Sequence, residues 1–296
     1  MAGSSSGTVK QVDDPSAGVG TILKAALPLI PGVNQVPGIK KSGGDIPDLT
    51  LRSEGVRVEA DHVEAYAGLC GFEPSERLPL TYLHMLAFPL HMGILTDSSF
   101  PYPAVGTVHL ENRITRRHHV ARGAKVDVEV TATNKRPAAK GTIFDMVATV
   151  TSEGETVWES TSTYLRVGKR NEDGEKGTEF DEVPKGPITW KLDADLGRRY
   201  ASVSGDYNPI HLYPITAKAL GFPRQIAHGM WTKARCVAAL ENRIPEAATV
   251  AVAWKKPVLL PAKVDFGSAR AEGGYDFALT RPKDGAPHLQ GSVREA

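Results

Sequence analysis

Apolar and polar residues along this chain follow helical spacing first and then strand spacing. Apolar positions recur every three or four residues around HVEAYAGLCGF (62–72) and TYLHMLAFPLHMGILTD (81–97), which predicts two helices. The stretches that follow are rich in β-branched and aromatic residues and are bounded by Gly, Asn or Pro, which predicts strands. These four stretches are TVHLENRITRR (107–117), AKVDVEVTATNKR (124–136), TIFDMVATVTSEG (142–154) and ETVWESTSTYLRV (155–167).

The same order of helices and strands returns in the second half of the chain. ADLGRRYASVSG (194–205) and HGMWTKARCVAALEN (228–242) have helical spacing. The strands predicted after them are TVAVAWKKPVLL (249–260), AKVDFGSARAE (262–272), YDFALTRPK (275–283) and HLQGSVRE (288–295). Because the connections between these strands are short, we expect a mainly antiparallel sheet.

The two halves can be aligned residue by residue. Tyr66-Ala67 matches Tyr200-Ala201, and Gly71 matches Gly205, at a constant offset of 134. AKVDV from 124 matches AKVDF from 262, and the larger offset of 138 is an ordinary loop-length difference. The chain is therefore a pseudo-twofold α+β repeat. At the offset of 134, Phe72 and Arg77 occupy the positions of Asp206 and His211.

Composition divides the chain into four parts. Residues 1–50 are small and polar and then Pro- and Gly-rich, which predicts a mobile and wrapping segment. Residues 51–168 form the first repeat, and the charged run GKRNEDGEKGTEFDEVPKG predicts a linker over 169–187. Residues 188–296 form the second repeat.

Charge and cysteine content exclude several classes of function. The 35 Lys and Arg residues against 34 Asp and Glu give a net charge of +1, so no global field indicates a nucleic-acid or anionic-membrane partner. Two distant cysteines without CxxC spacing predict neither a zinc site nor a disulfide. No signal-peptide pattern is present, and ILKAALPLI (22–30) is too short to span a bilayer, which predicts a cytoplasmic protein without stable membrane insertion.

One motif carries chemistry: GDYNPIH, at residues 205–211. Its Gly, Asn and Pro predict a turn that brings Asp206 and His211 to one cleft. A carboxylate and a neutral imidazole can both accept a proton and can position one water molecule. The later run AHGM (227–230) predicts a helix start at which the N–H of Gly229 faces a developing oxyanion.

GDYNPIH followed by AHGM resembles the MaoC-like (R)-specific enoyl-CoA hydratases and the related 3-hydroxyacyl-thioester dehydratases. The resemblance implies that Asp206 and His211 are the catalytic pair, that Gly229 supplies the oxyanion N–H, and that Asn208 helps to hold the loop. It also implies a double hot-dog fold, in which each half wraps an antiparallel sheet around a helix. By the same resemblance, which is greatest to actinobacterial, mycobacterial-type members, the first half is expected to be a repeat that has lost the motif and encloses the acyl chain.

Other candidate residues have two interpretations each. Ser204 and Tyr200 either line the pocket or simply pack the helix. Lys255, Lys256 and Arg235 either contact coenzyme A phosphates or belong to a solvated face. The residues Met85, Phe88 and Met92 either shape an acyl tunnel or fill the core, and His84, His91 and His228 are interpreted as structural histidines rather than metal ligands.

The sequence predicts a hydro-lyase of fatty acid metabolism that hydrates trans-2-enoyl thioesters and dehydrates (R)-3-hydroxyacyl thioesters. It requires no metal or cofactor of its own, because the thioester acidifies C2 and N–H donors stabilise the enolate. The substrate carries coenzyme A or phosphopantetheine, either as an acyl-CoA or on an acyl-carrier protein. The alternatives are an acyl-CoA thioesterase on the same fold and a noncatalytic acyl-thioester binding module. Two repeats in one chain predict a monomer or a homodimer.

Overall fold

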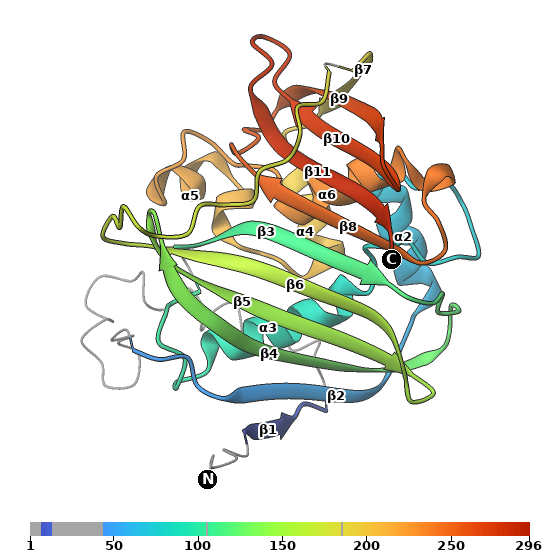
Figure 1. Ribbon diagram of the computed structural model, residues 1–296, viewed down its shortest axis with the longest axis vertical. Coiled ribbons are helices and arrows are strands. Elements are labelled where there is room, and N and C mark those ends of the chain that lie inside the picture. The colour runs from blue at the N-terminus through green and yellow to red at the C-terminus, as the bar shows by residue number, and fades with distance from the viewer. Residues whose placement is uncertain (1–6, 14–43, 105, 185) are drawn as a thin grey trace.

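The computed structural model describes residues 7–13, 44–104, 106–184 and 186–296. The strands in these residues form one eleven-stranded sheet with the order β1-β2-β4-β5-β6-β3-β8-β11-β10-β9-β7. Figure 1 shows that the sheet curves around α3 in one half and around α6 in the other. This arrangement is the predicted double hot-dog fold.

Both predicted helices and all four predicted strands of the first half are present. The elements of this half are β2 (Leu49–Arg57), α2 (Ala60–Cys70), α3 (His84–Thr96), β3 (Thr107–Arg116), β4 (Lys125–Ala138), β5 (Gly141–Ser152) and β6 (Glu155–Val167). Helix α3 lies in the concave side of this sheet and contacts β2 and β4. Most of its apolar residues, among them Leu90 and Ile94, are buried in the core that α3 shares with the sheet.

The second half repeats this order with short additional helices. It contains β7 (Ile188–Leu192), α4 (Leu196–Ser204), the 3₁₀ turn η3 (Pro209–His211), α5 (Pro214–Ala219), α6 (Gly229–Ala238), η4 (Glu241–Arg243), β8 (Ala248–Trp254), β9 (Ala262–Ala271), β10 (Gly274–Thr280) and β11 (Pro287–Glu295). Two of these elements, β7 and α5, were not predicted. Each is short, so its periodic pattern is too brief to recognise.

The halves meet where β3 pairs with β8 in antiparallel register, with Ile114 opposite Val250. The strand order on one side of this join mirrors the order on the other side: β3-β6-β5-β4-β2 and β8-β11-β10-β9-β7. Helix α2 also contacts α4 and α6 across the join. One continuous sheet and one shared hydrophobic core therefore hold the two repeats together.

The predicted mobile segment at the N-terminus is corrected in part. Residues Thr8–Gln11 form β1, which pairs in parallel with β2. Strand β2 was not predicted, and it begins at Leu49, just before the predicted boundary at residue 51. Residues 14–43 of the predicted wrapping segment lie outside the described residues. Cys70 and Cys236 are buried free thiols. In the described ranges, no helix is long and apolar enough to cross a bilayer.

Candidate active site

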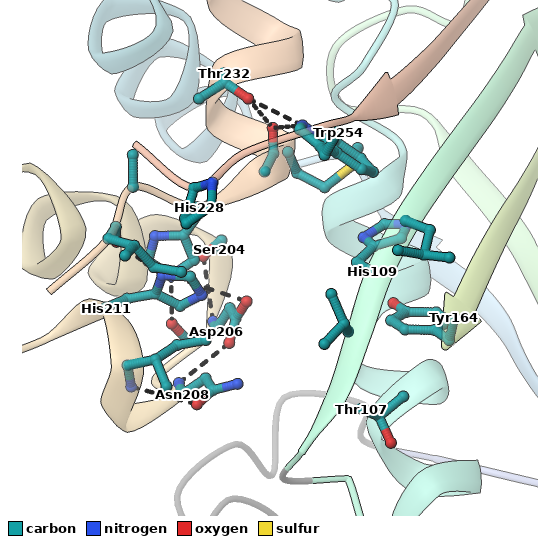
Figure 2. Close-up of a pocket in the computed structure, with 18 of the residues that line it drawn as sticks. Thr107, His109, Tyr164, Ser204, Asp206, Asn208, His211, His228, Thr232 and Trp254 are labelled. Carbon is teal, nitrogen blue, oxygen red and sulfur yellow. Dashed lines mark hydrogen bonds and ion pairs between the residues drawn. The ribbon is translucent and has the colours of Figure 1, made fainter. Parts of the chain in front are cut away.

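A cavity of about 800 Å³ has walls from both halves of the chain. Residues of α3, β3 and β6 form the first-half wall, and the second-half wall comes from the 204–211 segment, the start of α6 and the end of β8. Figure 2 shows Asp206 and His211 on one side of this cavity and His109 and Tyr164 on the other. The volume lies within the range of pockets that bind small organic ligands.

The turn after α4 places Asp206 on the cavity wall. Helix α4 ends because Gly205 adopts the left-handed conformation (φ 72°), which a residue with a Cβ disfavours. The Asp206 N–H then donates to Ser204 Oγ at 3.2 Å, and Asp206 Oδ1 accepts the Asn208 N–H at 3.1 Å. Asn208 Oδ1 accepts the Ile210 N–H at 3.4 Å, so both side chains brace the turn.

His211 is buried at the end of this turn with a defined tautomer. Its Nδ1 lies 2.8 Å from the carbonyl oxygen of Ile226. Because a carbonyl can only accept, Nδ1 carries the hydrogen and Nε2 keeps its lone pair. Burial lowers the pKa of His211, whereas the Asp206 carboxylate and the Ile226 carbonyl act in the opposite direction. The ring is therefore a neutral imidazole at pH 7.

A close backbone contact fixes the position of His211. Gly197, in the first turn of α4, lies against the carbonyl oxygen of His211, and a Cβ built on Gly197 would overlap that oxygen. The helix and the turn can therefore approach this closely only when a glycine stands at 197. The motif pattern contains no signal for this contact, because Gly197 lies fourteen residues before His211 in the sequence.

His228 joins the pair as a third polar residue. Its Nε2 donates to the carbonyl oxygen of Asp206 at 2.8 Å, and its ring stacks on His211 with 3.7 Å between centroids. One ligand-type atom from each of Asp206, His211 and His228 lies within 4.8 Å of the others. The two imidazole planes are only 25° apart, so their lone pairs do not converge on one metal position. The arrangement suits proton transfer better than metal binding.

Gly229 is the first residue of α6, so its N–H has no acceptor within the helix. The indole of Trp254 packs against it, and a Cβ at this position would lie 2.9 Å from Trp254 Cε2. Trp254 Nε1 donates to the carbonyl oxygen of Gly229 at 3.1 Å and to Thr232 Oγ1 at 3.0 Å. A glycine is thus required at position 229 so that Trp254 can pack against it. This reason adds to the predicted one, which is that a ligand approaches the N–H closely.

The remaining predicted site residues divide into two groups. Ser204, Tyr200, Lys255 and Lys256 line the cavity, as do Met85, Phe88 and Met92. Tyr200 also packs against His228, with ring centroids 4.8 Å apart, so lining and packing both describe it. Lys255 Nζ donates to the carbonyl oxygen of Thr178 at 2.7 Å.

Arg235 does not line the cavity, which corrects its prediction as a phosphate contact. Its guanidinium lies over the ring of Trp190, 4.4 Å from the centroid, and its Nη1 donates to the carbonyl oxygen of Gly71 at 3.1 Å. The helix directs this side chain toward α2, so nearness to the motif along the sequence was misleading. Arg235 instead connects the two halves.

Several cavity residues carry no sequence signal. His109 on β3 stacks on Tyr164 of β6 with 4.5 Å between ring centroids. The ring of Trp254 on β8 also packs against His109, with 4.6 Å between their centroids. These three strands are adjacent only because β3 pairs with both β6 and β8. A strand pattern predicts which face is buried, but it does not reveal which strand will be the neighbour.

Comparison with known proteins gives three similarities. The MaoC-like domain family matches residues 174–274. The chain is 36% identical over 284 residues to 3-hydroxyacyl-thioester dehydratase X of Mycobacterium tuberculosis (strain ATCC 25618 / H37Rv), covering 94% of this chain and 98% of that protein. The crystal structure of HtdX of Mycobacterium tuberculosis superimposes with a TM-score of 0.75 at 36% identity, covering 83% of this chain and all of the other.

A more distant solved structure shares the fold alone. Full-length peroxisomal multifunctional enzyme type 2 from Drosophila melanogaster superimposes with a TM-score of 0.62 at 16% identity. The match covers 96% of this chain and 53% of that chain. The shared fold therefore extends over both halves of this chain and not only over its second half.

Proposed function

This chain belongs to the MaoC-like 3-hydroxyacyl-thioester dehydratases, and we propose that it hydrates trans-2-enoyl thioesters reversibly, dehydrating (R)-3-hydroxyacyl thioesters, through Asp206 and His211. One observation carries this assignment. A carboxylate oxygen of Asp206 and a ring nitrogen of His211 lie within 4.8 Å on one cavity wall, with the Nδ1 of His211 already bonded to Ile226. We infer that a single water molecule bridges these two groups.

In the hydration direction, Asp206 and His211 hold this water against C3 of the enoyl thioester. The water oxygen bonds to C3, one of its protons passes to the pair, and the pair delivers one proton to C2. The pair ends in the protonation state in which it began. Dehydration is the reverse: the pair takes the C2 proton and returns a proton to the departing hydroxyl.

The thioester oxygen becomes negatively charged as C3 is attacked, and this charge needs a donor. The Gly229 N–H stands at the positive end of the α6 dipole on the same wall as His211. A preorganised N–H in a cavity shielded from water is worth roughly 10²–10³ in rate. Trp254 donates to the carbonyl oxygen of Gly229, so it holds the Gly229–Met230 peptide, which is next to the peptide that carries this N–H.

The rest of the cavity fits an acyl thioester of coenzyme A or of an acyl-carrier protein. Met85, Phe88 and Met92 offer apolar surface to the acyl chain, and Lys255 and Lys256 offer positive charge to phosphate groups. Such substrates place the enzyme in fatty acid metabolism. His228 acts on the pair indirectly, because it bonds to the Asp206 backbone and stacks on His211.

The test is the loss of enoyl-thioester absorbance with crotonyl-CoA and with a longer trans-2-enoyl-CoA. We expect wild type to turn over at least one of them, and Asp206→Asn and His211→Ala to lower kcat by about 10²–10⁴ while remaining folded. Free thiol is measured in the same reactions. Thiol release without hydration would indicate a thioesterase, and binding without turnover by wild type would indicate a binding module.

A further inference from the structure

The cavity wall opposite Asp206 carries three polar aromatic side chains among its apolar residues, although it lies in the half assigned to the acyl chain. It is formed by His84 at the start of α3, His109 on β3 and Tyr164 on β6, and we refer to these three residues as the histidine wall. Figure 2 shows the rings of His109 and Tyr164 facing the second-half wall across the open cavity. A plain hydrocarbon chain gains nothing from imidazole or phenol groups at this position.

The histidine wall has unused hydrogen-bonding capacity. His84 Nδ1 and His109 Nε2 are shielded from solvent and have no hydrogen-bond partner among the described residues. His91, directly behind, is fully buried with both ring nitrogens unpartnered, and its ring centroid lies 5.4 Å from that of His84. An unsatisfied buried polar group is destabilising, so a ligand that supplies its partner gains affinity.

Neighbouring groups do not supply the missing partners. Lys233 is fully buried between the halves, but its Nζ bonds to the carbonyl oxygens of Asn112 and Val250 and to Asn112 Oδ1. Its three donors are therefore in use. His84 and His109 both line the cavity, so these two rings can contact a bound ligand.

The wall is held rigid and is uncharged. The ring of His109 lies between Tyr164 and Trp254, with centroids 4.5 Å and 4.6 Å away. Burial lowers the pKa of His91 and of His109 to about 3, so these rings are neutral at pH 7. A neutral imidazole has one donor and one acceptor, and a phenol has both. Such a wall matches a hydroxyl, keto or ether oxygen better than a carboxylate or phosphate.

We propose that the histidine wall binds a neutral oxygen function on the acyl chain beyond C3, so that the enzyme prefers oxygenated acyl thioesters to plain chains of equal length. The C3 oxygen itself is held by Asp206 and His211 on the opposite wall, so this oxygen is a second one. The inference rests on the proposed function and narrows its substrate class.

The experiment compares kcat/KM for a plain medium-chain trans-2-enoyl-CoA with kcat/KM for chains of equal length that carry a hydroxyl or keto group at successive positions beyond C3. A site built to hydrogen-bond an oxygen rejects the analogue that lacks it, so we expect wild type to prefer one oxygenated substrate by about tenfold or more. Tyr164→Phe and His84→Leu should bring that ratio close to one. Exposed Arg77→Ala is the control that keeps it.

Calorimetry measures the affinity for saturated acyl-CoAs with and without the same oxygen. This affinity reports on ligand binding by the histidine wall independently of turnover. Equal affinity and equal kcat/KM at every position would overturn the inference and leave the proposed function intact. A preference that persists in both wall variants would overturn the assignment to these residues. Tighter binding of the oxygenated acyl-CoA without turnover of any substrate would support the role of the histidine wall and contradict the proposed function.

Discussion

The two halves end their outer helices in the same way and differ at the next residue. Helix α2 stops at Gly71 with φ 77°, and α4 stops at Gly205 with φ 72°. Phe72 follows in the first half and is buried against Tyr66, with ring centroids 6.3 Å apart. Asp206 follows in the second half and lines the cavity. The glycine at the end of each helix therefore sets where the next residue lies, and the side chain of that residue determines whether the position is apolar core or a reactive group.

The difference continues five residues further along each half. Arg77 is exposed and its backbone forms a bridge to Ala121, whereas His211 is buried at the cavity. The first half contributes histidines and an aromatic residue to the cavity from α3, β3 and β6 instead of a catalytic turn. A repeat freed from carrying the reacting groups can change its cavity wall without altering the chemistry of the other half.

The largest difference in activity between the two halves is expected from substitutions at the paired positions 77 and 211. We predict that His211→Ala lowers kcat by about 10²–10⁴, because the general base is lost, whereas Arg77→Ala stays within about twofold of wild type. Initial rates of enoyl-CoA hydration measure both variants. Similar losses in both would mean that the first half takes part in the reaction, and the comparison would fail.

The residue pattern was sufficient to predict the α+β repeat and the juxtaposition of Asp206 and His211, and the resemblance to the MaoC-like hydratases supplied the double hot-dog fold. Helix and strand spacing is local, and the glycine, asparagine and proline of GDYNPIH favour a turn whatever surrounds it. The structure brings the two side chains onto one wall as expected. Their catalytic role remains a prediction that the kinetic variants test.

The rest of the site depends on contacts that no local pattern contains. His109 and Tyr164 reach the cavity because β3 lies between β6 and β8, and that order is a property of the whole sheet. The pairing of β1 with β2 joins segments 41 residues apart in the sequence, with Thr8 opposite Leu49. Arg235 illustrates the opposite error, since a residue six positions after Gly229 faces α2 instead of the cavity.

A second contrast concerns glycines inside the corresponding helices α4 and α2. We predict that Gly197→Ala displaces His211, because the added methyl group overlaps the His211 carbonyl oxygen, and lowers kcat by roughly tenfold or more together with stability. Gly68→Ala meets no atom within 4 Å and should stabilise the protein by about 0.5–1 kcal/mol through helix propensity. Urea unfolding and hydration rates measure both. Unchanged activity in Gly197→Ala would refute the backbone contact.

A third prediction concerns pH, since both halves bury neutral histidines. Burial lowers the pKa of His84, His91 and His109 in the first half and of His211 and His228 in the second. Below pH about 6.5 the unfolded chain binds protons at these histidines that the folded chain does not, so their contribution to the free energy of unfolding falls as pH falls and is fully present above about 7.

The substitution His91→Leu tests the contribution of a single histidine to this pH dependence. Because His91 has a pKa of about 3 in the folded protein and has no hydrogen-bond partner in the described residues, its replacement should flatten the pH dependence of unfolding by about one proton. Urea unfolding at about pH 7.5, 6.5 and 5.5 measures the slope. A slope equal to that of wild type would mean that His91 is already protonated in the folded protein.

The smallest contrast separates the two kinds of basic residue near the second-half motif. Lys255 and Lys256 line the cavity, so Lys256→Ala should raise KM for an acyl-CoA by about two- to fivefold, with an effect that shrinks at high salt, as expected for a partly solvated charge pair. Arg235→Ala should leave KM unchanged, because its guanidinium lies on Trp190, and should lower stability instead. Steady-state kinetics at two salt concentrations and urea unfolding distinguish the two effects. If Arg235→Ala raised KM and Lys256→Ala did not, the phosphates would lie over α2 and the cavity mouth would have to be reassigned.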